Sequence, residues 1–323
     1  MIRVGILGAG GMGNVHARQY KKMSDVDVRI FDLDQERTDT FIKRWDIPAA
    51  ESFNELMSGS DVIDVCLPTD LHLEFGLKAI AAGRALFVEK PVARTFEDAI
   101  KLAEAADKAG VVYQPGQVVR FFPEFSNGNR LVKEGAVGNP GAARMRRGGL
   151  APTGSDSWFM DHSRSGGVLL DLAIHDFDWL RWTLGEVTQL TSRSLGARTG
   201  SGPDYALTTL SFDSGAIAHV ESTWMDPSGF RTAFEVCGSQ GMIEFDSRQT
   251  ASLRAHFPIK SYNEAPLAPL DDPYYKQLTS FLDAVKNRTK PPVTGWDGAM
   301  AVGIALAALE SAKKGAPVVP PSL

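Results

Sequence analysis

The amino-acid sequence predicts two domains, an α/β domain with a parallel sheet and, after it, an α+β domain. Its 323 residues are about twice the usual length of one domain. In the first third, short β-rich runs alternate with helical patterns, which is typical of βαβ units and a parallel sheet. After about Phe121, strand-like runs follow one another and are bracketed by helices. We therefore assign residues 1–120 to the first domain and residues 121–323 to the second.

The first domain should begin with a strand and then alternate regularly. In chain order, strands are expected at 2–7, 26–31, 61–67, 85–88 and 111–113, and helices at 12–22, 35–45, 71–82 and 96–109. The last of these helices carries apolar residues at helical spacing, which predict its sheet-facing stripe: Leu102, Ala105, Ala106 and Ala109.

The second domain should open with a helix at 124–134 and a glycine-rich connector at 135–141, and it should end with helices at 274–287 and 298–314. Between them, turn signals divide strand-like runs into antiparallel hairpins. One turn at 213–215 separates the runs 207–212 and 216–224, and another at 238–241 separates 234–237 and 242–245.

The composition excludes several classes of protein. With 34 Lys and Arg against 39 Asp and Glu, the formal net charge is −5. The chain therefore lacks the excess of positive charge that binding to nucleic acid or to an anionic membrane requires. Hydrophobic residues make up 43% and charged residues 23%, which excludes a disordered chain. No targeting segment or membrane span is expected. The two cysteines, Cys66 and Cys237, cannot form a disulfide framework, so we expect reduced, buried thiols in a cytosolic protein.

A glycine-rich turn follows the first strand and opens a helix. It reads Gly8-Ala9-Gly10-Gly11-Met12-Gly13, which is G-x-G-x-x-G. The first glycine permits the tight turn, the second lets the main chain approach a pyrophosphate, and the third lets helix and strand pack closely. The pyrophosphate would lie at the helix N-terminus, where free N–H groups and the helix dipole favour an anion. We expect a dinucleotide cofactor to contact Gly8, Gly10, Gly11, Met12 and Gly13.

Asp32 stands at the end of the second strand, 19 positions after Gly13. A carboxylate there can bind the adenosine ribose hydroxyls and would repel a 2′-phosphate. No arginine directly follows it, and Arg37 is expected on the exposed helix face, so NAD is favoured over NADP. The alternative is that Asp32 only caps the helix that starts near Gln35.

Lys90 ends the fourth strand of the first domain, in Glu89-Lys90-Pro91. In an open α/β sheet the ligand crevice lies beyond the carboxyl ends of the strands, so Lys90 is expected where a nicotinamide would bind. Pro91 lacks an N–H group and ends the strand abruptly. The alternative is a solvated loop lysine.

Asp171 and His175 lie in an apolar run that predicts one mostly buried helix after Gly166-Gly167. At spacing i and i+4 they would share a helix face. The carboxylate could orient the imidazole and stabilise its protonated form, so that His175 could take a hydroxyl proton as a hydride leaves the adjacent carbon. The alternatives are a satisfied buried hydrogen bond and half of a metal site, although no third ligand stands at a sensible spacing.

The other histidines carry weaker signals. His16, His219 and His256 are interpreted as structural or surface residues, and His162 as a residue that could line the site. No metal is predicted.

These motifs together resemble the glucose–fructose oxidoreductase, inositol dehydrogenase and MocA-like oxidoreductase family. The resemblance covers essentially the whole chain and rests on Gly8–Gly13, Leu67–His72, Ala82–Pro91, Gly166–His175, Tyr274–Lys286 and Pro292–Gly298. The Glu-Lys-Pro sequence is specific only in combination with Asp-x-x-x-His.

The resemblance implies an N-terminal Rossmann domain, with a doubly wound parallel sheet, and a C-terminal domain with a large, open, mostly antiparallel sheet. The exposed face of that sheet commonly forms the oligomer interface, which implies a homodimer or homotetramer. Lys90 would hold and polarise the substrate hydroxyl, His175 would be the acid/base, and Asp171 would orient both. Residues along the cofactor would be Leu67, Pro68, His72, Glu89 and Lys90.

The sequence departs from the family pattern at two places. Leu67 stands where Thr or Ser is frequent, and Val119-Arg120 stands where the family has paired arginines near the entry of the second domain. The first position acts through its backbone, whereas the second bears on the substrate. Besides the three catalytic residues, Arg120 and Trp158 are expected to contact the substrate.

We therefore predict an NAD-dependent dehydrogenase of a small-molecule polyol or sugar, with inositol 2-dehydrogenase as the nearest pattern. Two other functions remain open: a non-catalytic NAD-binding sensor or repressor on the same fold, and a glycosidase that uses bound NAD. The presence of Lys90, Asp171 and His175 together argues against the sensor.

Overall fold

The computed structural model describes residues 1–152, 155–249, 253–256, 261–264 and 272–323. The chain forms two compact units: unit 1 comprises residues 1–118 and 271–299, and unit 2 comprises residues 119–270 and 300–323. Residues 271–299, which the sequence placed in the second domain, therefore join unit 1. They do so through a tertiary contact, because α11 (Pro273–Asn287) packs against α1 (Gly11–Tyr20). Periodicity does not show which core a helix joins.

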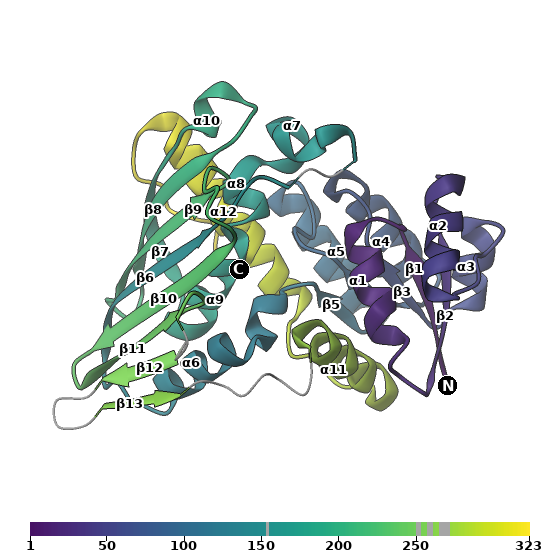
Figure 1. The fold of residues 1–323 in the computed structure, drawn as a ribbon, viewed down its shortest axis with the longest axis horizontal. Coiled ribbons are helices and arrows are strands. Elements are labelled where there is room, and N and C mark those ends of the chain that lie inside the picture. Colours follow the sequence, from purple (N-terminus) through teal and green to yellow (C-terminus); the bar gives the residue numbers. More distant parts are fainter. Residues whose placement is uncertain (153–154, 250–252, 257–260, 265–271) are drawn as a thin grey trace. The chain divides into compact units, whose positions relative to one another are not determined.

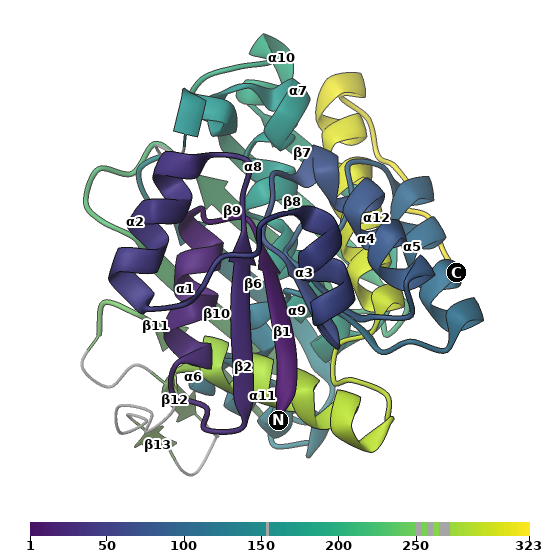
Figure 2. The same ribbon diagram turned by 90° about the vertical axis from the view of Figure 1, so that its right-hand side faces the viewer.

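Unit 1 is built on a five-stranded sheet in the order β2-β1-β3-β4-β5, in which every pairing is parallel. Figures 1 and 2 show β1 and β2 side by side. Its strands are β1 (Ile2–Leu7), β2 (Val26–Phe31), β3 (Val62–Val65), β4 (Ala85–Val88) and β5 (Tyr113–Pro115). The helices between them are α1, α2 (Gln35–Trp45), α3 (Phe53–Gly59), α4 (His72–Ala81) and α5 (Phe96–Ala109). Short 3₁₀ turns lie at η1 (Thr69–Leu71) and at η2 (Val118–Phe121), which begins at the last residue of the first segment of unit 1.

Helices cover both faces of this sheet. Phe87 of β4 contacts His16 of α1 and Phe281 of α11, with ring centroids 5.4 and 5.5 Å apart. The preceding residue, Leu86, faces the other way, because side chains alternate along a strand. On that side a Cβ atom at Gly76 of α4 would lie 3.5 Å from Leu86. The predicted doubly wound α/β architecture is confirmed.

The cap residues explain why α5 has the predicted bounds. Thr95 accepts a hydrogen bond from the Asp98 amide at 3.1 Å, and Gly110 ends the helix with φ of 64°. Both are favourable helix ends. The buried stripe includes Leu102 and Ala106 as predicted, but Ala105 and Ala109 are not buried. Ala99 and Ala103 take their places.

Unit 2 contains an eight-stranded sheet in the order β13-β12-β11-β10-β6-β9-β8-β7 (Figure 1). Its strands are β6 (Pro140–Gly148), β7 (Val187–Ser194), β8 (Tyr205–Phe212), β9 (Ile217–Thr223), β10 (Arg231–Gly238), β11 (Gly241–Asp246), β12 (Leu253–His256) and β13 (Ser261–Glu264). The helices and the 3₁₀ turn that belong to it are α6 (Pro123–Lys133), η3 (Ser155–Met160), α7 (His162–Ser165), α8 (Gly167–Asp171), α9 (Ile174–Leu184) and α10 (Gly196–Thr199). The chain ends with α12 (Gly295–Lys314), which begins in unit 1 and ends in unit 2.

All pairings in this sheet are antiparallel except that of β6 with β9. Both predicted hairpins are confirmed, since β8 pairs with β9 and β10 with β11, with Gly238 opposite Gly241. The sequence did not predict β6, because its three arginines and its Pro-Gly start are typical of a loop. It is a strand because it pairs with β9 on one side and with β10 on the other.

One face of the sheet packs on an aromatic core, and the other bears exposed side chains. Phe125 of α6 contacts the rings of Trp179, Phe234 and Phe245, and the indole N–H of Trp179 donates to the Phe125 carbonyl at 2.8 Å. Along β8 and β9 exposed and buried residues alternate, and Leu207 on the exposed side keeps 50% of its surface accessible. The predicted large, mostly antiparallel sheet is confirmed.

Both cysteines are free thiols, but only one fits the prediction fully. Cys66 is buried, whereas Cys237 in β10 is half-buried. Within the described residues, no helix combines the length and hydropathy needed to cross a membrane.

Candidate active site

The glycine-rich turn joins β1 to α1 as the sequence predicts. Gly8 has φ of 110°, and a Cβ atom on Gly13 would collide with the Gly8 carbonyl oxygen, so both positions require glycine. At Gly10, by contrast, a Cβ atom would meet nothing within 4 Å. Gly10 is the N-cap of α1, and no side chain among the described residues caps that end. The turn therefore presents an uncapped helix N-terminus to open space, which suits a pyrophosphate.

Asn14, which the sequence analysis missed, holds this turn. Its side-chain amide donates to the carbonyls of Ala9 and Gly10, both at 2.9 Å, and its carbonyl accepts from the Trp45 indole at 2.8 Å. The only sign of this role in the sequence is that Asn14 is a polar residue in the first turn of the predicted helix.

Asp32 faces the turn from the end of β2. Its carboxylate accepts from the Ala9 amide at 2.8 Å and from the Asp34 amide at 2.9 Å. The N-cap of α2 is Asp34, which accepts from the Arg37 amide at 3.0 Å. The alternative that Asp32 merely caps this helix is therefore wrong. A carboxylate beside an uncapped helix N-terminus fits the ribose and pyrophosphate of NAD.

A cavity of about 290 Å³ is lined by Ala9, Asn14, Asp34 and Arg37 among others. Two of these residues, Ala9 and Asp34, bind the Asp32 carboxylate through their amides. Arg37 is bound to Asp34, with Nε 3.1 Å from Oδ2, and its side chain is 43% exposed. Its predicted place on the exposed helix face is confirmed.

His72 joins the ends of β3 and β4. Its two ring nitrogens lie 2.7 Å from the Pro91 carbonyl oxygen and 2.8 Å from the Leu67 carbonyl oxygen. Burial lowers the pKa of His72, although both carbonyls and nearby carboxylates raise it. His72 therefore lies between the loops that follow β3 and β4, with one ring nitrogen facing a main-chain carbonyl of each. Its contact with the cofactor stays a prediction.

Lys90 lies at the carboxyl end of β4, as predicted. Its amide donates to Oε2 of Glu89 at 3.1 Å, and the Lys90–Pro91 peptide bond is cis. Glu89 is buried and Lys90 is half-buried, so the solvated-loop alternative does not describe this lysine.

Asp171 and His175 are not on one continuous helix, and that prediction is wrong. Asp171 is the last residue of α8, and His175 lies in the first turn of α9. The chain leaves the α-helical pattern between them, where the Ala173 amide donates to the Val168 carbonyl at 2.8 Å. Both residues thus lie at the junction of two helices, with Asp171 buried and His175 half-buried.

Two buried ion pairs fix the first turns of α9. Arg147 of β6 binds Asp176, with nitrogen–oxygen distances of 2.7 and 3.0 Å. Arg120 binds Asp178 through two bonds of 2.8 and 2.6 Å. Burial raises the pKa of Asp176, and the Arg147 guanidinium opposes that rise. These pairs, which the sequence did not predict, hold the helix that carries His175.

The other residues predicted near the substrate also have local partners. Arg120 lies over the Trp182 ring at 5.3 Å in addition to its bond with Asp178. Trp158 stacks on Phe159, with centroids 4.0 Å apart. His162 lies within hydrogen-bond distance of the Gly196 and Gly202 carbonyls, at 3.2 and 3.1 Å. Contact of Arg120 and Trp158 with a substrate stays a prediction.

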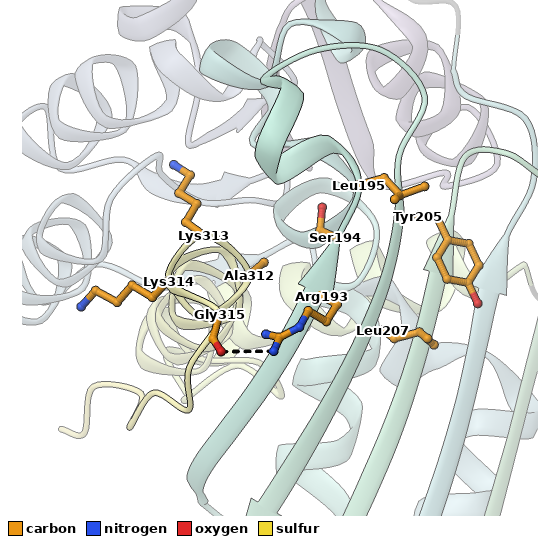
Figure 3. A pocket seen from close by; sticks show the side chains of 9 residues that line it. All are labelled: Arg193, Ser194, Leu195, Tyr205, Leu207, Ala312, Lys313, Lys314 and Gly315. Carbon is orange, nitrogen blue, oxygen red and sulfur yellow. Dashed lines mark hydrogen bonds between the residues drawn. The ribbon is translucent and has the colours of Figure 1, made fainter.

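A separate cavity of about 380 Å³ lies between β7, β8 and the end of α12 (Figure 3). Arg193 donates there to the Gly315 carbonyl at 3.1 Å, and Lys313 and Lys314 point away from the strands. Because these cations do not converge, the cavity is not a built anion site. Neither Asp171 nor His175 lines it.

Comparison with known proteins decides the family. Residues 2–117 match the oxidoreductase family with an NAD-binding Rossmann fold, and residues 127–244 match the GFO/IDH/MocA C-terminal domain. A 1,5-anhydro-D-fructose reductase of Ensifer adhaerens is 30% identical over 272 residues, which cover 82% of this chain and 81% of the relative. The chain belongs to the GFO/IDH/MocA family. Its N-terminal unit is thus an NAD-binding Rossmann domain, and the protein is an oxidoreductase.

Other members of the GFO/IDH/MocA family match nearly the whole chain. The scyllo-inositol 2-dehydrogenase (NAD(+)) of Bacillus subtilis is 28% identical, with 98% of this chain and 96% of the relative covered. Among solved structures, a probable dehydrogenase from Thermotoga maritima is 28% identical, with a TM-score of 0.85 and 98% of each chain covered. GenD2 from gentamicin A biosynthesis, in complex with NAD, is 25% identical, with a TM-score of 0.87 and coverage of 100% and 97%.

Proposed function

We propose that this oxidoreductase is an NAD-dependent dehydrogenase that converts a secondary hydroxyl of a polyol or sugar to a ketone, or the reverse. The observation that carries the proposal is the presence of Lys90, Asp171 and His175 in a chain that matches inositol 2-dehydrogenases along nearly all of its length. Those relatives make a cyclic polyol the first substrate to try.

Three side chains share the chemistry in this proposal. The Lys90 ammonium holds the substrate hydroxyl and favours its ionisation. His175 accepts the hydroxyl proton as the C–H bond breaks, and Asp171 stabilises the resulting imidazolium. NAD, when bound, supplies the acceptor for the hydride. In the reverse direction His175 returns the proton to the carbonyl oxygen.

Asp32 selects the cofactor in this proposal. Its carboxylate is already held at the turn by two amides, so it can accept from ribose hydroxyls without first being ordered. A 2′-phosphate would bring a second anion to the same place. NAD is therefore preferred over NADP.

We also propose that the exposed face of the eight-stranded sheet forms a homodimer or homotetramer interface. Large apolar side chains on that face, such as Leu207 and Ile217, are 50% and 46% exposed. Exposed apolar patches on sheets are typical of protein interfaces. Analytical ultracentrifugation of the wild type and of Leu207→Lys tests this, and a monomeric wild type would contradict it. The cytosolic location inferred from the sequence stays a prediction.

A substrate screen tests the proposed activity. The purified protein is incubated with NAD and a panel of inositols, aldoses and sugar acids, and NADH absorbance is followed. The proposal predicts NADH formation in step with a ketone product. Hydrolysed product without net NADH would support the NAD-using glycosidase instead, and binding of NAD without turnover of any compound would support the sensor.

A further inference from the structure

A buried cluster of polar side chains lies beneath α1 in unit 1, and the proposed chemistry does not use it. His16 of α1 is fully buried, and its Nδ1 lies 2.8 Å from Oδ2 of Asp64 in β3. Its Nε2 lies 3.2 Å from Oε1 of Glu89, which follows β4. Tyr20 and Cys66 complete the cluster, with the Tyr20 hydroxyl donating to Asp64 at 3.0 Å and the Cys66 thiol at 3.4 Å.

The charge state of the cluster follows from these contacts. His16 contacts Asp64 of β3, Cys66 just after it, Glu89 after β4 and Tyr274 of α11. Tyr20 of α1 reaches the cluster through Asp64. Burial raises the pKa of both Tyr20 and Cys66, so these two groups keep their protons. Burial alone would lower the pKa of His16, but the Asp64 carboxylate raises it well above the usual range. Carboxylates thus flank the His16 ring on both sides, which favours its protonated form.

A metal ion is the other occupant that such a cluster suggests. In the described part of the chain, ligand atoms of His16, Asp64 and Cys66 lie within 4.8 Å of one another. Their shortest separation, 2.8 Å from Nδ1 to Oδ2, is a charge-assisted hydrogen bond. Ligand atoms about 2.0–2.3 Å from a tetrahedral zinc ion stand farther apart than this. A proton shared along this bond explains the geometry without a metal.

Glu89 links the cluster to Lys90. While one carboxylate oxygen faces His16, the other accepts from the Lys90 amide at 3.1 Å. The main chain after β5 closes the remaining side, because a Cβ atom on Gly116 would lie only 2.8 Å from Oε1 of Glu89. The Glu89 carboxylate thus lies between the His16 ring, with Nε2 and Oε1 at 3.2 Å but not hydrogen-bonded, and the main chain at Gly116. Its other oxygen accepts from the amide of Lys90.

We propose that His16 is a positioning residue for Lys90, acting through the Asp64–His16–Glu89 chain of charged contacts. The inference rests on the proposed function, in which Lys90 holds the substrate hydroxyl. If the Glu89 carboxylate loses the imidazolium, it becomes an uncompensated buried charge and reorients. The Lys90 turn then loses its anchor, and the ammonium no longer meets the hydroxyl in the productive geometry.

Two substitutions of His16 separate its contact with Asp64 from its contact with Glu89. The amide nitrogen of asparagine takes roughly the place of histidine Nδ1, and that of glutamine takes the place of Nε2. His16→Asn therefore keeps a donor toward Asp64, and His16→Gln keeps one toward Glu89. Tyr20→Phe is the matched control, since it removes a donor to Asp64 from the same cluster without touching Glu89. For each variant, kcat, KM, the Kd for NAD and hydrogen exchange at the Lys90 amide are measured.

The proposal predicts that His16→Asn lowers kcat roughly 10- to 100-fold, as expected for a misplaced catalytic group, and speeds exchange of the Lys90 amide. His16→Gln, which also lacks the charge but keeps a donor toward Glu89, should lose clearly less kcat than His16→Asn. Tyr20→Phe should stay within about threefold of the wild type, and in the His16 variants the loss of kcat should exceed any rise in the Kd for NAD. Equal losses in His16→Asn and His16→Gln, or an equal loss in Tyr20→Phe, would overturn the proposal.

If the His16 variants do not fold, a substitution of Glu89 still tests the proposal. Glu89→Gln keeps the size of the side chain but removes the negative charge that binds the imidazolium. It should lower kcat and speed exchange of the Lys90 amide, and no change in either would overturn the proposal. Hydrogen exchange also separates the proposed dehydrogenase activity from the positioning role of His16. A wild type that oxidises none of the panel contradicts the proposed function, whereas the exchange rate of the Lys90 amide still decides whether His16 anchors the turn.

Discussion

Replacing Asp32 by asparagine should shift the cofactor preference toward NADP. The change keeps the shape of the side chain but removes the charge at the turn. Two unit charges 4 Å apart in water interact by about 1 kcal/mol, and a 2′-phosphate carries a charge of about −2. Because Asp32 is half-buried, its surroundings are less polarisable than water, so the value for water is a lower bound on the repulsion. Relief of this repulsion is then worth about 2 kcal/mol, or roughly thirtyfold in affinity for NADP relative to NAD.

The same substitution should weaken NAD binding itself. Asparagine has one acceptor oxygen, whereas the carboxylate accepts from both the Ala9 and Asp34 amides and would also accept from ribose. Losing a bond to a charged group costs about 1.5–3 kcal/mol. We therefore expect the Kd for NAD to rise about tenfold or more, together with a lower Tm.

The assay is a titration of the wild type and the variant with each cofactor, followed by protein fluorescence. Asp27→Asn serves as the control, since it makes the same charge change at the other end of β2. An unchanged ratio of the two dissociation constants in Asp32→Asn, or an equal shift in Asp27→Asn, would refute the assignment of Asp32 to the ribose site.

Three further predictions concern catalysis, stability and pH. His175→Ala should lower kcat by about 10²- to 10⁴-fold in steady-state assays while the Kd for NAD stays near its wild-type value, and near-normal turnover would exclude the acid/base role. Arg147→Met should lower the free energy of unfolding by about 3–5 kcal/mol in guanidinium titrations, because it strands the buried Asp176 carboxylate. Arg144→Met, whose side chain is 72% exposed, should change it by less than about 1 kcal/mol. Since the folded pKa of His16 is raised, its contribution to stability is complete below the unfolded pKa of about 6.5 and is lost as the pH rises through the folded value. The difference in unfolding free energy between the wild type and His16→Gln should therefore shrink from pH 6 toward about pH 9, and a constant or growing difference would contradict the imidazolium.

The parallel sheet was predictable because its signals are local. The strands at 2–7, 26–31 and 85–88 and the helices at 35–45 and 96–109 have the observed bounds. Each is a short apolar run or an amphipathic stretch between cap or turn residues. The glycine-rich turn and Asp32 were predictable for the same reason, since their spacing is set within one βαβ unit.

The missed features depend on contacts far apart in the chain. The arginine-rich β6 is a strand because two strands about 75 and 90 residues away pair with it. The junction between α8 and α9 breaks a run whose apolar periodicity continues through it, and Arg147 and Arg120 fix α9 from outside the run. His16 was interpreted as structural or surface, since nothing in the sequence places Asp64 and Glu89 on either side of its ring.

Isotope transfer shows whether the protein oxidises a secondary alcohol by passing hydride to NAD. A polyol that carries deuterium on the reacting carbon is incubated with the enzyme and NAD, and the reduced cofactor and the product are analysed by mass spectrometry. We expect one deuterium in the reduced cofactor for each ketone formed. Deuterium that is retained in the product or lost to water, with no labelled reduced cofactor, would contradict it.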